Sequence, residues 1–238
     1  MRKILALGLV LAMIVSLAAC KNDTSIQTPE VTPPAETKSR EINETMTGSK
    51  TLALYEVLSG EKFAMDVNFI GAKMTMYRDG DTMYVRVDLL GAMTGSVIIS
   101  DGKITIFEEY DGELLENDDL TYTTRELEQA HLDKIFELFE WYRTEMMNLG
   151  GAIMLENGVS DAFRGRELYF ERIESGGDDN VFYFFDEDDN IVGTIINETQ
   201  MKFFVSPTIP EGAFDIPEGY TEDEDGDFEK RFFRMFGE

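Results

Sequence analysis

Two long stretches of this chain alternate apolar with polar residues, a pattern that predicts β-strands. In the first stretch Phe63, Met65 and Val67 share one side of a strand, because successive side chains of a strand point to opposite faces. Asp-Gly pairs at 79–80 and 101–102 divide this stretch, and such pairs favour the tight turns of hairpins. The second stretch covers residues 167–174, 181–186, 191–197 and 201–205. Each stretch therefore predicts an antiparallel meander.

Two other stretches have the apolar spacing of helices. A short pattern over residues 52–58 ends at Ser59-Gly60, ahead of the first strands. Further along, Thr123-Thr-Arg-Glu126 has the form of a capping box, which opens helices. Apolar residues then recur at helical spacing as far as Leu149, and Gly150 ends the pattern. We predict a helix of about 24 residues here, roughly 36 Å long, enough to cross a whole sheet.

Residues 1–19 have the three zones of an export signal peptide. Arg2 and Lys3 give the positive start, an apolar run follows, and small residues lead up to Cys20. The run is shorter than the ~20 apolar residues that a bilayer crossing needs. Leu17-Ala-Ala-Cys20 resembles the lipobox of bacterial lipoproteins. This resemblance implies cleavage before Cys20 and transfer of a diacylglyceryl group to its thiol. An ordinary signal followed by an incidental cysteine is the alternative.

The chain after the signal divides into three parts. Residues 20–50 are polar, rich in Thr, Glu and Pro, and too poor in large apolar side chains to offset the entropy of ordering. We expect a disordered tether there, anchored to the membrane by lipid at Cys20. Residues 51–220 have the length of one domain. Residues 221–238 form an acidic C-terminal tail.

The tail contains a short amphipathic helical pattern. Phe228, Phe232 and Phe236 are four residues apart and share one helical face, beside the basic residues Lys230 and Arg231. A terminal helix docked on its own domain fits this pattern. A helix that binds a membrane surface or a partner fits it too, and the sequence leaves both interpretations open.

Acidic side chains dominate the composition. The chain carries 47 Asp and Glu against 21 Lys and Arg, a formal charge of −26. Loss of residues 1–19 removes Arg2 and Lys3, which leaves 19 basic side chains and a formal charge of −28. Nucleic-acid binding depends on basic groups that neutralise phosphates, so we expect no nucleic-acid partner. The charge also disfavours docking on anionic lipid, so lipidated Cys20 is the expected membrane contact.

Residues able to carry out catalysis or hold a metal are scarce. Lipidation would consume Cys20, the single cysteine, and leave no thiolate. The single histidine, His131, falls on the apolar stripe of the predicted long helix, and no Gly-x-Ser-x-Gly turn accompanies it. Residues 186–190 begin like a calcium loop, but Ile191 stands in place of the required glycine and Asn197 in place of the bidentate glutamate. We expect a non-enzymatic protein without metal or cofactor, although the abundant carboxylates leave a glycosidase pair neither excluded nor identifiable.

Methionine is frequent on or beside the first group of strands, where β-branched residues are usual. The residues are Met65, Met74, Met76, Met83 and Met93. Methionine is flexible and polarisable, which suits a surface that adapts to irregular apolar shapes. A core packed with methionine and a cavity lined with methionine are equally open interpretations.

The order of these elements resembles the lipoprotein-carrier superfamily typified by LolA, LolB and the mycobacterial lipoproteins LppX and LprG. The resemblance covers about residues 51–220 and includes the closing segment Phe214-Asp-Ile-Pro-Glu-Gly-Tyr220. It implies an α+β fold, in which helices pack on the concave side of a strongly curved antiparallel β half-barrel. In that family an apolar cavity between sheet and helices holds acyl chains, some relatives are stress sensors, and the family is not enzymatic.

The expected cavity lining comes from both strand groups. The residues are Phe63, Met65, Val67, Phe69, Met74, Met76, Met83, Val85, Val87, Leu168 and Phe170. The leading hypothesis is a lipid-anchored binding protein on the outer face of the plasma membrane, which holds an acyl chain or another apolar ligand in this cavity. The alternative is a cell-envelope sensor or structural lipoprotein with a filled core, whose surface binds another protein.

The lipobox resemblance predicts the outcome of replacing Cys20. Cys20→Ala should abolish palmitate labelling of the protein and move it from the membrane fraction to the soluble fraction, because two or more acyl chains make a stable anchor. Metabolic labelling and fractionation measure both effects. Continued lipid labelling of the variant would contradict the prediction.

Overall fold

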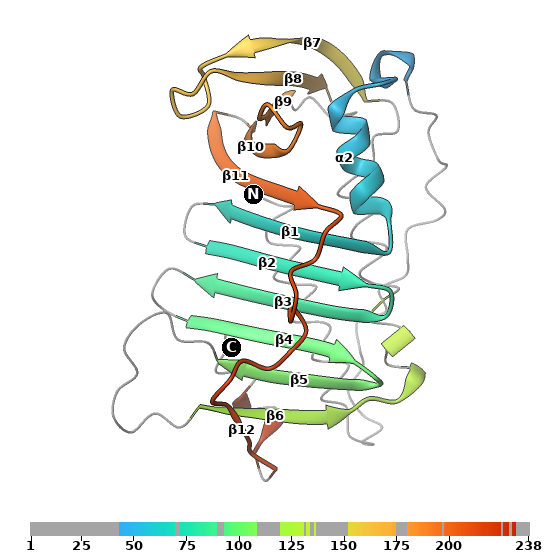
Figure 1. Cartoon of the computed structure of the whole chain (residues 1–238), viewed down its shortest axis with the longest axis vertical. Coiled ribbons are helices and arrows are strands. Elements are labelled where there is room, and N and C mark those ends of the chain that lie inside the picture. Colours follow the sequence, from blue (N-terminus) through green and yellow to red (C-terminus); the bar gives the residue numbers. More distant parts are fainter. Residues whose placement is uncertain are drawn as a thin grey trace, which may run out of the picture.

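The computed structural model describes residues 43–231, apart from 70–71, 90–92, 109–119, 131, 134–135, 137–151, 175–179, 197, 225 and 229 (Figure 1). The described residues form one sheet of 12 strands. The strands of its first half are β1 (Lys62–Phe69), β2 (Ala72–Asp79), β3 (Thr82–Leu89), β4 (Met93–Ser100), β5 (Lys103–Glu108) and β6 (Thr121–Glu126). The others are β7 (Ile153–Ser160), β8 (Leu168–Glu174), β9 (Asn180–Phe185), β10 (Ile191–Ile196), β11 (Thr199–Ser206) and β12 (Thr221–Glu222).

Two meanders, each running in chain order, make up this sheet. The strand order is β12-β6-β5-β4-β3-β2-β1-β11-β10-β9-β8-β7, and each neighbouring pair is antiparallel except β6 with β12. The meanders join where β1 pairs with β11, from Ala64 opposite Ser206 to Asn68 opposite Lys202. This one long-range pairing turns two separate meanders into a continuous sheet.

The strand predictions from alternation are confirmed, with small shifts at the ends. Hairpin turns are present at both predicted Asp-Gly pairs, although the first is centred one residue later, on Gly80 and Asp81. In the turn between β4 and β5, Asp101 has φ 49° and Gly102 has φ 76°, the left-handed conformation that this type of hairpin turn requires. β6 and β7 are strands that the sequence analysis did not predict.

The predicted α+β half-barrel with helices on its concave side is wrong. The structure is 54% strand and 15% helical, and its strands form an open, mostly antiparallel sheet. Thr123 and Glu126, the predicted capping box, lie in β6, where Thr123 pairs with Ile106 of β5. Pairing with a neighbouring strand has overridden the local helix signal, and threonine is a good strand former. Helical residues follow at 129–130, 132–133 and 136, and the rest of the predicted long helix lies outside the described residues.

One face of the sheet, here called the helix face, carries the main core. Cross-strand pairing aligns Met65, Met76, Val85, Val97 and Ile106 in one row over β1 to β5. Helix α2 (Lys50–Ser59) packs over this face beside β1 and β11, with its Leu54 and Leu58 in the core. Leu132, Phe136 and Phe228 complete the cover.

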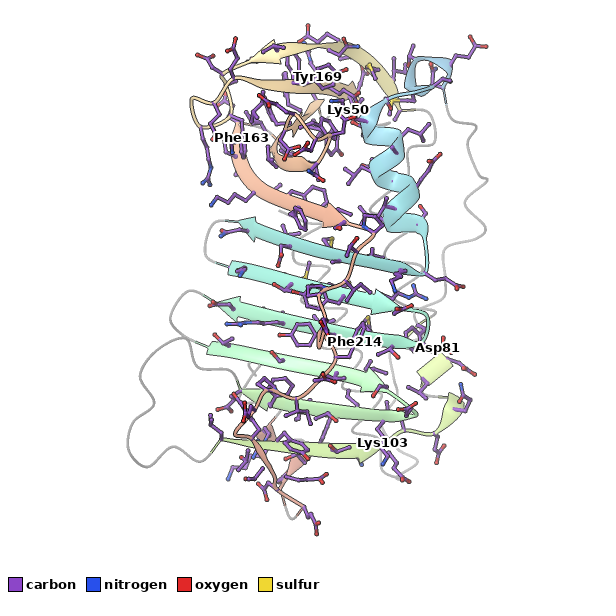
Figure 2. All side chains as sticks on the ribbon, viewed as in Figure 1. Lys50, Asp81, Lys103, Phe163, Tyr169 and Phe214 are labelled. Atoms are coloured by element: carbon purple, nitrogen blue, oxygen red, sulfur yellow. The ribbon has the colours of Figure 1, made fainter. Side chains whose placement is uncertain are left out.

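The opposite face, here called the strap face, is crossed by the chain that follows β11. In Figures 1 and 2 this segment runs over β1 to β5, with Phe214 above the middle of the sheet. Its residues Phe214, Ile216 and Tyr220 pack on a cluster from the strands. That cluster consists of Tyr77, Tyr84, Ile98, Phe107 and Tyr122. The closing segment quoted for the family resemblance therefore serves as a strap that covers apolar surface.

Packed residues extend beyond the predicted domain limits at both ends. Asn43 caps the short 3₁₀ helix η1 (Glu44–Met46), and Met46 is fully buried against Ala152 and Ile173. The sequence analysis placed these residues in the tether, so the folded part begins before residue 51. In the tail, Phe228 is buried in the main core, which agrees with a docked segment, whereas Phe232 and Phe236 lie outside the described residues.

The strap can be tested at Tyr220. Its hydroxyl donates a hydrogen bond to the backbone carbonyl of Glu108 at 2.6 Å, and its ring meets Phe107 edge-on at 5.4 Å. Tyr220→Phe should lower the free energy of unfolding by about 1 kcal/mol, the usual net value of one hydrogen bond. Tyr220→Ala should lower it by about 2–4 kcal/mol, because ring packing is lost as well. Equilibrium urea unfolding measures both values. If the two variants lost the same free energy of unfolding, packing of the ring against the sheet would be contradicted.

Candidate functional site

Most residues of the expected cavity are core residues of the helix face. Five of them are almost completely buried, with exposed fractions of 1% to 4%: Phe63, Met74, Met76, Met83 and Val85. Most of these pack in the same cluster as Leu54 and Leu58 of α2. Side chains with so little accessible surface have protein atoms against nearly all of their surface, as the side chains of a packed core do.

Leu168 and Phe170 lie on the other face of the sheet from these buried residues, so the prediction that all of them share one face is wrong. Pairing connects Tyr183 of β9 to Glu171 of β8 and to Thr194 of β10, and these residues continue the helix face. Leu168 and Phe170 therefore point to the strap face. There they pack in a second aromatic cluster with Phe163 and Phe184, whose rings stack at 5.3 Å.

The remaining cavity residues lie toward the far ends of β1 and β3. Met65, Val67 and Val87 are half-buried, and Met65 and Val87 pack against the main core together with Phe203. Phe69 is the last residue of β1, opposite Ala72 of β2, and its side chain is outside the described set. At this end of the helix face, three predicted cavity residues keep accessible surface, and Phe170 on the strap face is also partly buried.

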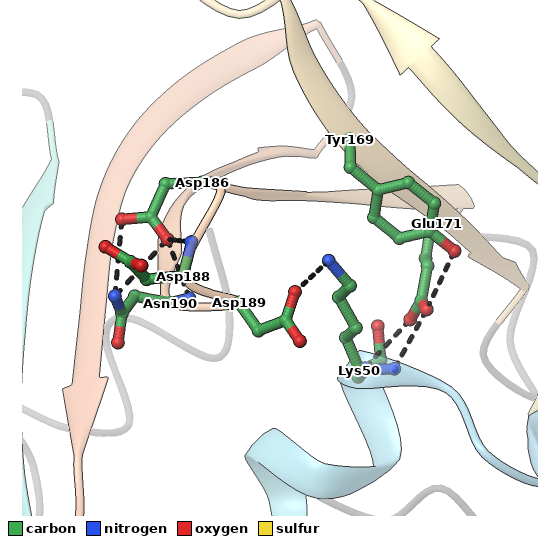
Figure 3. Close-up of polar contacts among 8 residues, drawn as sticks. Lys50, Tyr169, Glu171, Asp186, Asp188, Asp189 and Asn190 are labelled. Carbon is green, nitrogen blue, oxygen red and sulfur yellow. Dashed lines mark hydrogen bonds and ion pairs between the residues drawn. The ribbon is translucent and has the colours of Figure 1, made fainter.

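The most elaborate polar arrangement holds the first turn of α2 against the sheet (Figure 3). A helix start leaves its first backbone N–H groups without helical acceptors. The Glu171 carboxylate, on a residue only 1% exposed, accepts from the N–H of Lys50 at 2.9 Å and from that of Thr51 at 2.8 Å. The Ser49 hydroxyl accepts from the N–H of Leu52 at 3.0 Å. Glu171 thus places a negative charge at the positive end of the helix dipole.

Lys50 links this helix start to the turn between β9 and β10. Its ammonium group forms an ion pair with Asp189 and lies 4.3 Å from the centre of the Tyr169 ring. The Tyr169 hydroxyl in turn donates to Glu171 at 3.4 Å. Burial, followed by the charge of Glu171, raises the pKa of Tyr169 above its ordinary value. The helix, β8 and the turn therefore share one network of charged and polar contacts.

Two tyrosine hydroxyls meet farther along the same helix. Tyr55 of α2 and Tyr183 of β9 are hydrogen-bonded at 2.8 Å. Burial raises the pKa of Tyr55 above 10, although the bond to Tyr183 opposes the shift, and burial followed by Tyr55 raises that of Tyr183 further. Raised pKa values mean that both hydroxyls stay neutral at physiological pH, and that the contribution of this pair to stability is lost only as the pH rises above about 10. This pair is a structural bond rather than a proton donor for chemistry near pH 7.

The acidic turn after β9 satisfies its own hydrogen bonds. One carboxylate oxygen of Asp186 accepts from the backbone N–H groups of Asp188 and Asn190, at 3.0 and 2.9 Å. This is the side-chain turn that aspartate commonly forms, and it supports the interpretation as a hairpin turn rather than a calcium loop. Within the described part of the chain, no three His, Cys, Asp or Glu residues are grouped to hold a metal ion.

The exposed apolar side chains are concentrated at one edge of the sheet. Four large apolar residues are exposed in the described part, and three of them lie in β7: Ile153 at 38%, Leu155 at 43% and Val159 at 64%. The fourth is Phe204 of β11, at 42%. β7 is the end strand of the sheet, and its partner among the described residues is β8. Such an edge is a surface to which another polypeptide can add.

Cys20 and His131, the two residues with the most reactive side chains in the sequence analysis, lie outside the described residues. Among the described helices, none is long and apolar enough to cross a membrane. The sequence matches no protein-family model and no curated protein.

Neither the helix anchor nor the β7 edge is predicted by the pattern of the sequence. Glu171 stands between Phe170 and Arg172, and a lone glutamate in a strand carries no local sign of burial. Nothing local indicates that a helix 120 residues earlier places its N–H groups there. β7 was overlooked because Glu156, Asn157 and Gly158 interrupt its apolar pattern, and those residues are poor strand formers.

The helix anchor predicts a specific loss of stability. Glu171→Gln should lower the free energy of unfolding by about 1–3 kcal/mol, because the amide can accept from one helix N–H but leaves the other buried without an acceptor. Glu156→Gln is the matched control, since Glu156 pairs with Arg172 at 3.3 Å on the surface. Such an exposed ion pair contributes about 0–1 kcal/mol to the free energy of unfolding. Equal effects of the two substitutions in urea unfolding would contradict the anchoring role.

Proposed function

We propose that this chain is a lipid-anchored, extracytoplasmic protein of the bacterial cell envelope that acts by binding another protein and has no enzymatic activity. The export signal and lipobox pattern of residues 1–20 support the anchor on the outer face of the plasma membrane. The membrane contact is the lipid on Cys20, and the strongly acidic chain makes nucleic acid an unsuitable partner. Membership of the lipoprotein-carrier superfamily stays a prediction.

The observation that carries this proposal is the filled helix face. Phe63, Met83 and Val85 would have to border a ligand if the sheet held one, but they are at most 3% exposed. They favour the interpretation in which the methionine-rich residues are core. Three of the four exposed large apolar residues in the described part of the chain lie in β7, at the edge of the sheet, where they are available to a macromolecule.

The polar groups support a role without catalysis. Glu171, Tyr55 and Tyr183 are buried or bonded ionisable groups around α2, and each is engaged with this helix or with the strand beside it. Glu171 accepts from two helix N–H groups and from the Tyr169 hydroxyl, and the two tyrosines are bonded to each other, so these groups serve to fix the helix. A catalytic base would instead face a space that a substrate can enter.

A second candidate function, the carriage of an apolar ligand, has one observation in its favour. Met65, Val67 and Val87 are half-buried apolar residues at one end of the helix face, and Phe203 lies beside them. A short acyl group could contact that end without displacing the buried core. This contact surface is much smaller than the pockets of about 300–1,000 Å³ that enclose small molecules.

Native mass spectrometry of the lipidated chain, purified from membranes in detergent, separates the two functions. We expect the mass of the chain with its covalent anchor and no further lipid. A stoichiometric non-covalent lipid that is lost in Val67→Asp would overturn the protein-binding proposal and favour carriage. Asn68→Asp is the matched control, because Asn68 is exposed and the neighbouring position of the strand points to the opposite face.

A further inference from the structure

The β7 edge carries its exposed apolar side chains on both faces of the sheet. Val159 pairs with Tyr169, which lies on the helix face, and Ile153 pairs with Glu174, which alternation places on the strap face. Leu155 stands at a bulge, between the pairings of the residues before and after it. The apolar groups therefore surround the rim of the sheet instead of forming a patch on one face.

Another polypeptide or a lipid surface could cover such a rim. A polypeptide that adds to the sheet has to pair with the backbone of β7, and a bulge in an edge strand interrupts that pairing. A lipid surface needs no register, because the burial of apolar groups is non-directional. The outer backbone groups of an edge strand can stay hydrated among lipid headgroups, outside the hydrocarbon core in which unpaired groups are costly. The form of this edge therefore favours a lipid surface.

The chain enters the folded domain at this same edge. Asn43 is the first described residue and caps η1, and the N–H of Met154 in β7 donates to the Thr45 hydroxyl at 3.0 Å. Cys20, the predicted lipid anchor, precedes Asn43 by 23 positions. A flexible chain of that length spans about 25–30 Å on average. β12 lies at the other end of the long axis, roughly 50 Å away at about 4.8 Å per strand (Figure 1). β7 is therefore the edge nearest to the anchor.

The distribution of charge favours the same orientation. Residues 153–174, which form β7, β8 and the loop between them, carry five acidic and three basic side chains. One of the acidic side chains, Glu171, is buried against the N-terminus of α2. Residues 207–231, which include the strap and β12, carry nine acidic and two basic side chains. Anionic headgroups repel the strap end of the domain more strongly, so the β7 end turns toward the bilayer.

We propose that the β7 edge rests on the headgroup region of the bilayer that holds the chain's own anchor, with Ile153, Leu155 and Val159 as the contact residues. This inference rests on the lipid anchor of the proposed function and goes beyond it. It sets the sheet upright on the membrane and leaves the strap and β12 facing outward, toward a protein partner. Three half-exposed side chains make a weak contact, and the anchor makes it effective by holding the edge close to the lipid.

Fluorescence quenching in vesicles tests the contact. The lipidated chain with Val159→Cys is purified from membranes and labelled with an environment-sensitive dye, because Cys20 carries the lipid and the new cysteine provides the one free thiol. In phosphatidylcholine vesicles that contain phosphatidylcholine spin-labelled near the headgroup, we expect a blue shift and strong loss of fluorescence. Thr221→Cys, an exposed position of β12, is the matched control and should show neither effect. Equal quenching at the two positions would overturn the proposal.

A second variant tests whether the apolar side chains hold the edge on the lipid. With the dye at Asn157→Cys, the further change Val159→Asp should remove most of the quenching, because contact would then dehydrate a charge. Phe204→Asp is the matched control, since Phe204 is 42% exposed on β11, four strands away from β7. Melting temperatures verify that both variants keep the fold. Unchanged quenching in the Val159→Asp variant would overturn the assignment of the contact residues.

The mass of the purified chain distinguishes failure of this inference from failure of the proposed function. If the chain carries its anchor but the dye at position 159 is not quenched, the β7 contact is overturned and the proposed function stands. A blue shift without quenching by lipid means that a second copy covers the edge, and it overturns the bilayer as the occupant. A chain without the anchor overturns the proposed lipid anchoring and this inference together.

Discussion

The pairing of β1 with β11 is the contact on which the rest of the structure depends. It joins residues about 140 positions apart, from Ala64 opposite Ser206 to Asn68 opposite Lys202. Without it, the two meanders would be separate sheets with two edges each. With it, their strands form one sheet whose ends are β7 and β12. The ordering entropy of such a long-range contact is large, and the apolar cover on both faces of the sheet offsets it.

Helix α2 lies at this junction and fastens the two meanders together on the helix face. Its apolar side contributes Leu54 and Leu58 to a core shared with Phe63 of β1 and Val205 of β11. Its N-terminus is bound by Glu171 of β8, three strands away from β11 across the second meander. One short helix therefore contacts the junction with its side chains and the second meander with its backbone. The burial of Glu171 is stable because two N–H groups and the helix dipole compensate its charge.

On the strap face, the first meander is covered by chain from beyond β11 and the second by its own aromatic residues. Phe214 and Tyr220 of the strap pack over β3 to β5, whereas Phe163 packs against Phe184 in the second cluster. Gly193 permits that second contact, since a Cβ there would lie 2.1 Å from the Phe163 ring. Val159 of β7 pairs with Tyr169 and therefore lies on the helix face, where it is 64% exposed at the end of the sheet.

The sequence by itself determined most of the strands, with β6 and β7 as exceptions, because side-chain alternation and Asp-Gly turns act over a few residues. It also determined which residues of a strand share a face, as in the row of Phe63, Met65 and Val67. Which face meets the helix was decided by tertiary pairing. Leu168 and Phe170 were assigned to the wrong face because β8 is apolar on both sides, and a buried glutamate marks the side that meets α2.

Tertiary structure also decided whether the apolar residues form a cavity or a core. Methionine content suits both, and only the burial of Met76 and Met83 against neighbouring strands and the helix distinguishes them. The strand β6 was decided in the same way, since Thr123 and Glu126 favour a helix start locally but gain more from pairing with β5. Local sequence signals amount to about 1 kcal/mol or less per residue, and burial with complete strand pairing outweighs them.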